Sequence, residues 1–124
     1  FLASVIKEMG GVDLVLDDGS HRSSHIRASF NVLFPLLTDG GTYVIEDLHA
    51  AYWAKFGGGY KKRNSFFTDI FQMVHDLHHW HHFHGQKIAP AADNLASIHI
   101  HDSIVVLDKS EQTQPKRVNV GTKD

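Results

Sequence analysis

Apolar residues recur along this chain with two different spacings, and the change of spacing marks the predicted elements. Within residues 1–9 the apolar side chains lie three or four positions apart, which predicts a short amphipathic helix ending at Gly10-Gly11. Residues 12–16 then form a short, β-branched apolar run that ends at Asp17-Asp18. Such a run is typical of a strand buried on both faces, as in a parallel sheet.

The rest of the chain alternates in the same way between helical and strand-like patterns. The pattern predicts a helix over about 22–33, a turn at 38–41, a strand at 42–45, a Gly-rich aromatic loop over 48–65, a helix from 66 to about 84, an irregular stretch at 88–95, paired strands at 96–101 and 104–107, and a loose polar tail over 112–124. Alternating strands and helices indicate an α/β fold with a parallel sheet and right-handed crossovers, which here closes on an antiparallel hairpin. We assign residues 1–111 to one domain.

The first predicted strand is expected at an edge of this sheet. Exposed apolar edge strands are normally paired or covered, because their free backbone groups otherwise recruit another chain. We therefore expect the protein to self-associate as a homo-oligomer.

Composition narrows the possible classes of protein. The 124 residues carry 12 Lys and Arg against 14 Asp and Glu, a formal net charge of −2, and 42% of the residues are hydrophobic. This balance argues against a disordered chain and against a basic nucleic-acid binder. No apolar run approaches the roughly 20 residues of a transmembrane helix, and the absence of cysteine excludes thiolate chemistry. We expect a cytoplasmic protein whose partners include neither nucleic acid nor membrane.

Acidic pairs follow two consecutive predicted strands. Asp17-Asp18 ends the first strand and Glu46-Asp47 ends the second. In open α/β sheets, ligands bind at the carboxyl ends of the parallel strands, and neighbouring strands lie about 4.8 Å apart. Crowded carboxylates repel one another unless a cation neutralises them, and oxygen ligands favour Mg²⁺, Mn²⁺ or Ca²⁺ over Zn²⁺. The sequence therefore predicts a metal site, with helix caps or ordinary loop acids as the alternative.

A histidine stands beside the first acidic pair. His21 comes three residues after Asp18 and can face the same cavity. An imidazole there suits a general base for a substrate hydroxyl whose pKa the metal has lowered. We therefore predict His21 as the catalytic residue.

A series of short motifs follows the chain in a fixed order. They include Leu14-Val15-Leu16-Asp17-Asp18-Gly19-Ser20-His21, Tyr43-Val44-Ile45-Glu46-Asp47, Tyr52-Trp53, Phe56-Gly57-Gly58-Gly59-Tyr60 and Asp102-Ser103-Ile104-Val105-Val106. In this order they resemble the macrocin and mycinamicin sugar O-methyltransferases, which are class I enzymes dependent on S-adenosylmethionine. The resemblance covers about residues 1–111 and is most specific where the acidic DDGSH element is paired with the later Glu-Asp.

The resemblance implies a partial Rossmann-like class I methyltransferase sheet, containing strands four, five and the antiparallel hairpin of strands six and seven. It implies Mg²⁺ (or Mn²⁺) bound by Asp18, Glu46 and Asp47, with His21 as general base. Asp17 is expected to point elsewhere, because neighbours on a strand face opposite sides, although a cofactor-binding role stays open for it. The acceptor is expected to be a small molecule with a hydroxyl group, such as a sugar.

One departure from the family is large. The family's Gly-rich loop and ribose-binding acid precede its fourth strand, and neither has a match here, because Gly10-Gly11 precedes a strand rather than opening a helix. We therefore expect a C-terminal portion that lacks the cofactor-binding half and is inactive alone, with S-adenosylmethionine bound by the full-length parent. The alternatives are a cephalosporin hydroxylase-like or other metal-dependent enzyme on the same scaffold, and a non-catalytic truncated module that self-associates.

Two further groups of residues have both a functional and a structural explanation. Aromatic residues of the Gly-rich loop are candidates for a lid over the substrate, or for anchors of the loop in the core; they are Tyr52, Trp53, Phe56 and Tyr60. Six histidines surround Trp80, and we favour a polar helix face over a metal site because no carboxylate completes a recognisable ligand set; they are His75, His78, His79, His81, His82 and His84.

Overall fold

The computed structural model describes residues 1–82 and 94–122. Its elements, in chain order, are α1 (Leu2–Met9), β1 (Val12–Asp17), α2 (Ser23–Leu33), the 3₁₀ turn η1 (Phe34–Leu36), β2 (Leu37–Ile45), the 3₁₀ turns η2 (Leu48–Tyr52) and η3 (Ala54–Phe56), α3 (Phe66–Leu77), β3 (Leu95–His101) and β4 (Ile104–Lys109). The first helix ends where the sequence predicts, because Gly10 adopts a left-handed conformation with φ 80°.

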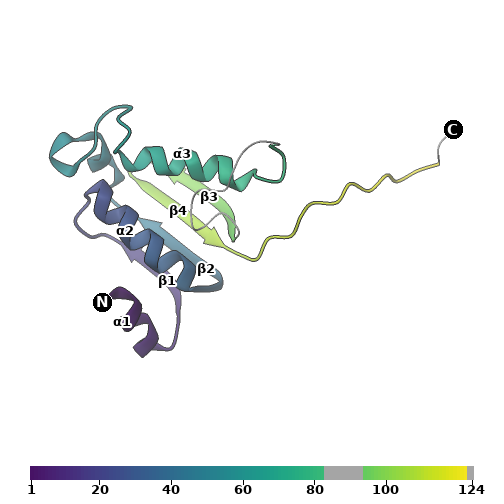
Figure 1. Cartoon of the computed structure of the whole chain (residues 1–124), viewed down its shortest axis with the longest axis horizontal. Coiled ribbons are helices and arrows are strands. Elements are labelled where there is room, and N and C mark those ends of the chain that lie inside the picture. The colour runs from purple at the N-terminus through teal and green to yellow at the C-terminus, as the bar shows by residue number, and fades with distance from the viewer. Residues whose placement is uncertain (83–93, 123–124) are drawn as a thin grey trace.

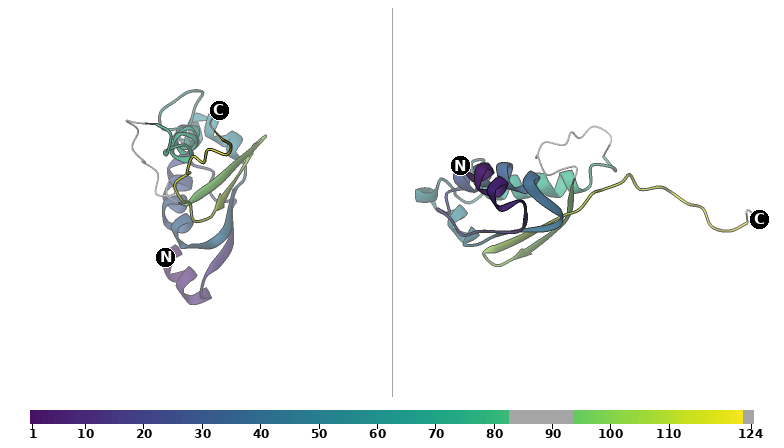
Figure 2. Two further views of the ribbon diagram at one scale, coloured as in Figure 1. Left: turned by 90° about the vertical axis from the view of Figure 1, so that its right-hand side faces the viewer. Right: turned by 90° about the horizontal axis from the view of Figure 1, so that it is seen from below.

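The four strands form one sheet in the order β1-β2-β4-β3. β1 and β2 are parallel, whereas β4 runs antiparallel to both of its neighbours. Helices α2 and α3 lie on the same face of this sheet (Figures 1 and 2). The predicted α/β class and the antiparallel hairpin are therefore confirmed, and β1 lies at an edge of the sheet as predicted.

The hydrophobic core fills the space between the sheet and these two helices. Tyr43, Ile45, Val105 and Leu107 are fully buried on the helix-facing side of the central strands. The helices supply the opposite wall with residues at helical spacing; they are Ile26, Phe30 and Leu33 of α2 and Phe66, Ile70 and Met73 of α3. The rings of Phe30 and Tyr43 meet edge to face, with centroids 5.2 Å apart.

The opposite face of the sheet is not covered within the described part of the chain. Leu14 and Leu16 of β1 are 62% and 58% exposed, so the prediction of a strand buried on both faces is wrong. The physical reason is that β1 alternates sides, and helices pack on only one of them (Figure 2).

Two predicted boundaries also differ from the structure. The expected turn at 38–41 lies within β2, which begins at Leu37 and passes an irregularity in its pairing with β1. The predicted helix from 66 ends at Leu77 and is followed by turns through His81, whereas His84 and most of the irregular stretch at 88–95 lie outside the described residues.

After β4, residues 110–122 contain no helix or strand, and this segment extends away from the sheet (Figure 1). Among the helices that the structure describes, none is long and apolar enough to span a membrane.

Candidate metal-binding and catalytic site

The parallel pairing of β1 and β2 brings the two acidic pairs together. Asp17 lies opposite Ile45 in the register, and the Glu46 amide donates a hydrogen bond to the Asp17 carbonyl oxygen at 3.1 Å. Both strands therefore end at the same level. The residues that follow, Asp18 and Asp47, project beyond the carboxyl edge of the sheet.

Asp18, His21 and Asp47 converge at this edge. Each offers one ligand atom, and these three atoms lie within 4.8 Å of one another. His21 Nε2 is 3.7 Å from Asp47 Oδ2, with the imidazole about one quarter exposed and the carboxylate about half exposed. Two carboxylates and an imidazole at this separation could bind one divalent cation that prefers oxygen and nitrogen ligands.

Glu46 and Asp17 lie beside this cluster without being part of it. Glu46 is half-buried, and its carboxylate is not among the three groups that converge. Asp17 points toward the core side of the sheet, where its Oδ2 accepts a 2.9 Å hydrogen bond from the Tyr43 hydroxyl. Burial and the nearby Asp17 charge raise the pKa of Tyr43 above its ordinary value, so the phenol stays protonated and donates this bond.

The backbone of the cluster is unusual at two positions. His21 and Asp47 have φ angles of 58° and 53°, in the left-handed region that non-glycine residues seldom adopt. Such conformations cost of order 1–3 kcal/mol each and concentrate at functional sites. Here they turn both side chains toward the shared edge, immediately after the strands end.

Aromatic rings form a wall on one side of His21. Its ring meets Phe56 edge to face with centroids 6.3 Å apart, and Phe56 in turn lies 6.0 Å from Trp53. The rings of Trp53 and His49 have centroids 5.1 Å apart. His49 Nδ1 in turn lies 3.1 Å from the Ser103 hydroxyl in the β3–β4 turn. The wall therefore connects the hairpin turn to the imidazole.

The four residues predicted as a lid divide into two groups. Trp53 and Phe56 lie on the side of His21, whereas Tyr52 packs on Phe67 of α3 with centroids 4.7 Å apart. Tyr52 and Tyr60 line a separate pocket beside the start of α3. Of the four, Phe56 contacts His21 of the acidic cluster, and Trp53 adjoins Phe56.

Two residues that hold the segments around His21 in place are not indicated by the sequence pattern. Arg22 donates a 3.0 Å hydrogen bond from its guanidinium to the Lys55 carbonyl oxygen, which ties the His21 segment to η3. His49 links Trp53 to Ser103, as described above. Neither belongs to a recognisable motif, because each acts through a contact between segments far apart along the chain.

The structure is an α/β sheet with a candidate cation site at the carboxyl edge of its parallel strands. Solved structures show that this sheet has the fold of a class I methyltransferase. MycE methyltransferase from the mycinamycin biosynthetic pathway, in complex with Mg and SAH, matches 90% of this chain at 30% sequence identity and a TM-score of 0.80. The same enzyme with Mg, SAH and mycinamycin VI matches at a TM-score of 0.81.

The sequence comparisons agree with the structural ones. A rhamnosyl-tetracenomycin 3'-O-methyltransferase of Streptomyces olivaceus is 37% identical over 119 residues, which is 92% of this chain. Demethylmacrocin O-methyltransferase of Streptomyces fradiae is 33% identical over 118 residues, and mycinamicin VI 2''-O-methyltransferase of Micromonospora griseorubida is 52% identical over 58 residues. The chain is a homologue of part of the macrocin and mycinamicin-type sugar O-methyltransferases, which confirms the predicted resemblance.

The chain spans about 30% of the length of the rhamnosyl-tetracenomycin and demethylmacrocin enzymes, and 30% of the MycE chain. No protein-family model matches it.

Proposed function

We propose that this chain forms the metal-binding and acceptor-activating part of an S-adenosylmethionine-dependent sugar O-methyltransferase. The observation that carries the proposal is the convergence of Asp18, His21 and Asp47 at the carboxyl edge of the sheet. The homology adds the class of reaction, since the relatives are named as O-methyltransferases of glycosylated tetracenomycin and macrolide compounds.

The side chains at this edge fit a magnesium ion. Asp18 and Asp47 offer carboxylate oxygens within 4.8 Å of each other, and both are exposed and therefore free to adjust. Glu46, which adjoins Asp47 but lies outside the three converging groups, is proposed as the third carboxylate ligand. When bound, Mg²⁺ supplies a Lewis acid that lowers the pKa of an acceptor hydroxyl.

His21 is proposed to accept the proton from that hydroxyl. Its imidazole is held edge-on by Phe56, and its Nε2 faces the Asp47 carboxylate at 3.7 Å. A carboxylate at this distance stabilises the imidazolium that forms when the ring takes a proton. The partial burial of His21 also leaves one side of the ring accessible to an acceptor.

The loop after β2 is proposed to shape the acceptor site. Phe56 contacts His21 and Trp53 adjoins Phe56, so an acceptor bound at His21 is proposed to meet aromatic surface. The Lys55 ammonium lies over both rings, 4.9 Å from the Phe56 centroid and 5.5 Å from the Trp53 centroid. The cofactor, S-adenosylmethionine, is proposed to bind a part of the full-length protein that this chain does not include, so the chain alone is expected to be inactive.

Self-association is part of the same proposal. Among the described residues, the edge strand β1 has one backbone edge without a paired strand, and the apolar side chains of Leu14 and Leu16 are exposed. A second copy of the chain could pair with this edge and bury both leucines. Sedimentation of the wild type against Leu14→Thr/Leu16→Thr tests this point, because a dimer that survives the double substitution would not depend on burying these leucines.

The metal site can be tested on this chain alone. Mn²⁺ replaces Mg²⁺ as the probe, and free Mn²⁺ is measured by electron paramagnetic resonance during titration. Asp18→Asn and Asp47→Asn are expected to weaken binding by about tenfold or more, whereas Glu8→Gln, the same chemical change on α1, is expected to leave it unchanged. Equal affinities for all four proteins would contradict the proposed site.

The reaction is tested on the longest open reading frame that contains this sequence. Transfer of a labelled methyl group from S-adenosylmethionine to a desmethyl glycosylated macrolide should require Mg²⁺ and Asp47. A protein that instead consumed 2-oxoglutarate with Fe²⁺ would be a hydroxylase on the same scaffold, and the proposal of methyl transfer would fail.

A further inference from the structure

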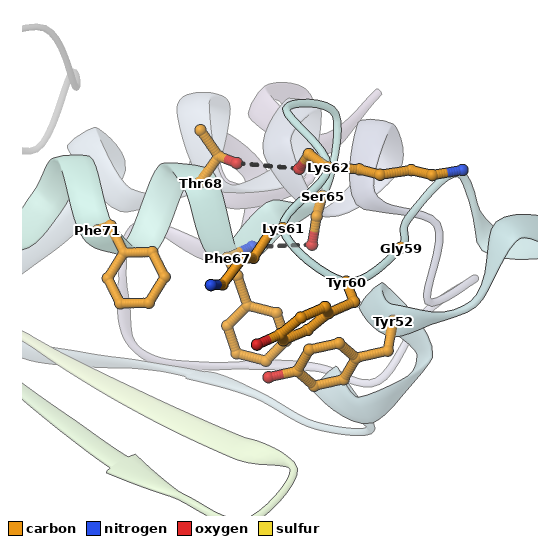
Figure 3. A pocket seen from close by; sticks show the side chains of 9 residues that line it. All are labelled: Tyr52, Gly59, Tyr60, Lys61, Lys62, Ser65, Phe67, Thr68 and Phe71. Atoms are coloured by element: carbon orange, nitrogen blue, oxygen red, sulfur yellow. Dashed lines mark hydrogen bonds between the residues drawn. The ribbon is translucent and has the colours of Figure 1, made fainter.

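A pocket of about 360 Å³ lies where the Gly-rich loop meets the first turns of α3 (Figure 3). Aromatic rings from both segments line it: Tyr52 and Tyr60 from the loop, Phe67 and Phe71 from the helix. None of the residues that line it is Asp18, His21 or Asp47. The pocket is therefore a feature distinct from the metal cluster.

These rings are exposed to an unusual degree for a surface patch. Tyr60 is 74% exposed and Phe71 is 63% exposed, whereas Tyr52 is braced against Phe67 with ring centroids 4.7 Å apart. In Figure 3 the rings of Tyr52, Tyr60 and Phe67 lie together on one side of the pocket. Aromatic side chains that line a concave site are typical of pockets that bind small molecules.

The hydroxyl groups of Ser65 and Thr68 are already used within the protein. Ser65 donates to the Ala51 carbonyl oxygen at 3.0 Å and accepts from the Phe67 amide, while Thr68 donates to the Lys62 carbonyl oxygen at 3.2 Å. These two hydroxyl groups are therefore closed to a ligand, and most of the remaining lining of the pocket is aromatic.

Two lysines line the pocket, and one of them contacts the rings. Lys61 Nζ lies 5.3 Å from the centroid of the Tyr60 ring. Figure 3 shows Lys61 directed toward the rings, whereas the Lys62 side chain points away from them. The pocket thus combines flat apolar walls with one ammonium group, that of Lys61, directed toward them.

We propose that this pocket is a binding site for a planar aromatic acid. The ligand's ring would lie against Tyr60, Tyr52 and Phe71, and its carboxylate would pair with the Lys61 ammonium. Tyr52 faces this pocket while its neighbour Trp53 faces His49 and Phe56, so the same loop serves two sites. The proposal needs neither metal nor cofactor and goes beyond the methyl-transfer function.

Three probes of similar size and different charge test this proposal on the chain without metal. Naphthoate, naphthalene methanol and naphthylmethylammonium are titrated while the backbone amides of Thr68 and Phe71 are followed by NMR. Naphthoate is expected to bind with a dissociation constant in roughly the millimolar range or below, about tenfold tighter than the neutral alcohol, and the cation is expected to bind weakest.

Two variants separate the contributions of charge and rings. Lys61→Gln should remove the preference for naphthoate over the alcohol, whereas Lys116→Gln, the same change in the C-terminal segment, should keep it. Tyr60→Ser should weaken both probes, and its exposed position allows the variant to fold, as circular dichroism would verify. Equal affinity of the wild type for naphthoate and the alcohol, or shifts that map to Leu14 and Leu16 and survive Tyr60→Ser, would overturn the proposal.

Discussion

His21 and Asp47 face each other at 3.7 Å although 26 positions separate them in the chain, and both hold left-handed backbone conformations. Each is placed by the end of a strand, β1 for His21 and β2 for Asp47, and the parallel register of those strands sets their separation. Left-handed conformations at non-glycine residues lower stability, so folding alone does not favour two of them with their side chains turned toward each other. Such strain is typical of functional sites.

The first prediction concerns what His21 does in this arrangement. If the imidazole is the general base, His21→Ala should leave the Mn²⁺ affinity of the chain within about twofold while lowering kcat of methyl transfer in the full protein by about a hundredfold or more. Titration with Mn²⁺ and steady-state kinetics measure the two effects separately. Equal losses in affinity and kcat would instead identify His21 as a metal ligand.

A second prediction uses the backbone of Asp47. Asn tolerates the left-handed region about as well as Asp, so Asp47→Asn should leave the Tm unchanged or raise it, because it removes one of two facing carboxylates. Asp47→Ala should cost about 1 kcal/mol relative to Asp47→Asn, since alanine lacks the side chain that eases this conformation. Thermal unfolding of both variants without metal gives the comparison. An alanine variant as stable as the asparagine variant would show that φ at Asp47 is not strained in solution.

The meeting of the two acidic pairs was predictable, because it depends only on where two apolar runs end and on their parallel pairing. Asp18 and Asp47 come together for this reason. The left-handed conformations of His21 and Asp47 were not predictable, because Asp and His tolerate positive φ better than most residues but seldom adopt it, so residue type alone does not locate it. The separation of Tyr52 from Trp53 was also hidden, because it depends on how η2 packs against α3.

The boundaries of β2 show that turn-forming residues in a sequence do not always mark the end of a strand. Thr38-Asp39-Gly40-Gly41 is typical of a turn, yet it lies inside β2. Gly40 adopts φ 83°, and a side chain at Gly41 would meet the Asp13 and Thr38 carbonyl oxygens at 2.9 Å. These glycines let the strand pass its irregular pairing with β1. The exposed Leu14 and Leu16 went unpredicted because an apolar run indicates a side chain suited to burial, not what covers it.

A third prediction addresses the loop that holds Trp53 and Phe56. The backbone of Gly58 lies directly against the carbonyl group of Ala51, so a Cβ there would collide with it. Gly58→Ala should therefore destabilise the protein by about 2–3 kcal/mol and displace the loop from His21. Chemical denaturation measures the cost, and NMR of the His21 ring reports the displacement.

Gly57→Ala is the matched control for that substitution. Gly57 has φ 75° and open space around its Cβ position, so alanine should cost only about 1 kcal/mol, from the backbone conformation alone. The His21 ring signals should stay in place. Similar losses for the two variants would mean that the Ala51 contact does not constrain the loop.

The last prediction concerns the exposed face of the sheet, where Asp108 of β4 joins three strands. Its carboxylate accepts hydrogen bonds from Ser97 of β3 at 2.7 Å and from Thr42 of β2 at 2.8 Å, and His99 Nε2 lies 3.1 Å away. The bond from Ser97, followed by those from Thr42 and His99, holds the pKa of Asp108 below its ordinary value despite partial burial.

A lowered pKa in the folded state means that the ionised carboxylate stabilises the fold. This contribution is complete above the ordinary aspartate pKa, at about pH 4, and is lost as the pH falls through the lower folded value. Asp108→Asn should therefore lower the Tm by about 4 °C at pH 7, and the difference from the wild type should shrink below pH 4. Thermal unfolding between pH 7 and pH 3 tests this, with Asp102→Asn in the adjoining turn as the control. If the difference in Tm between the wild type and Asp108→Asn stayed constant from pH 7 to pH 3, the stabilisation would not come from the charge of Asp108. A contribution from the ionised carboxylate must disappear when the carboxylate is protonated.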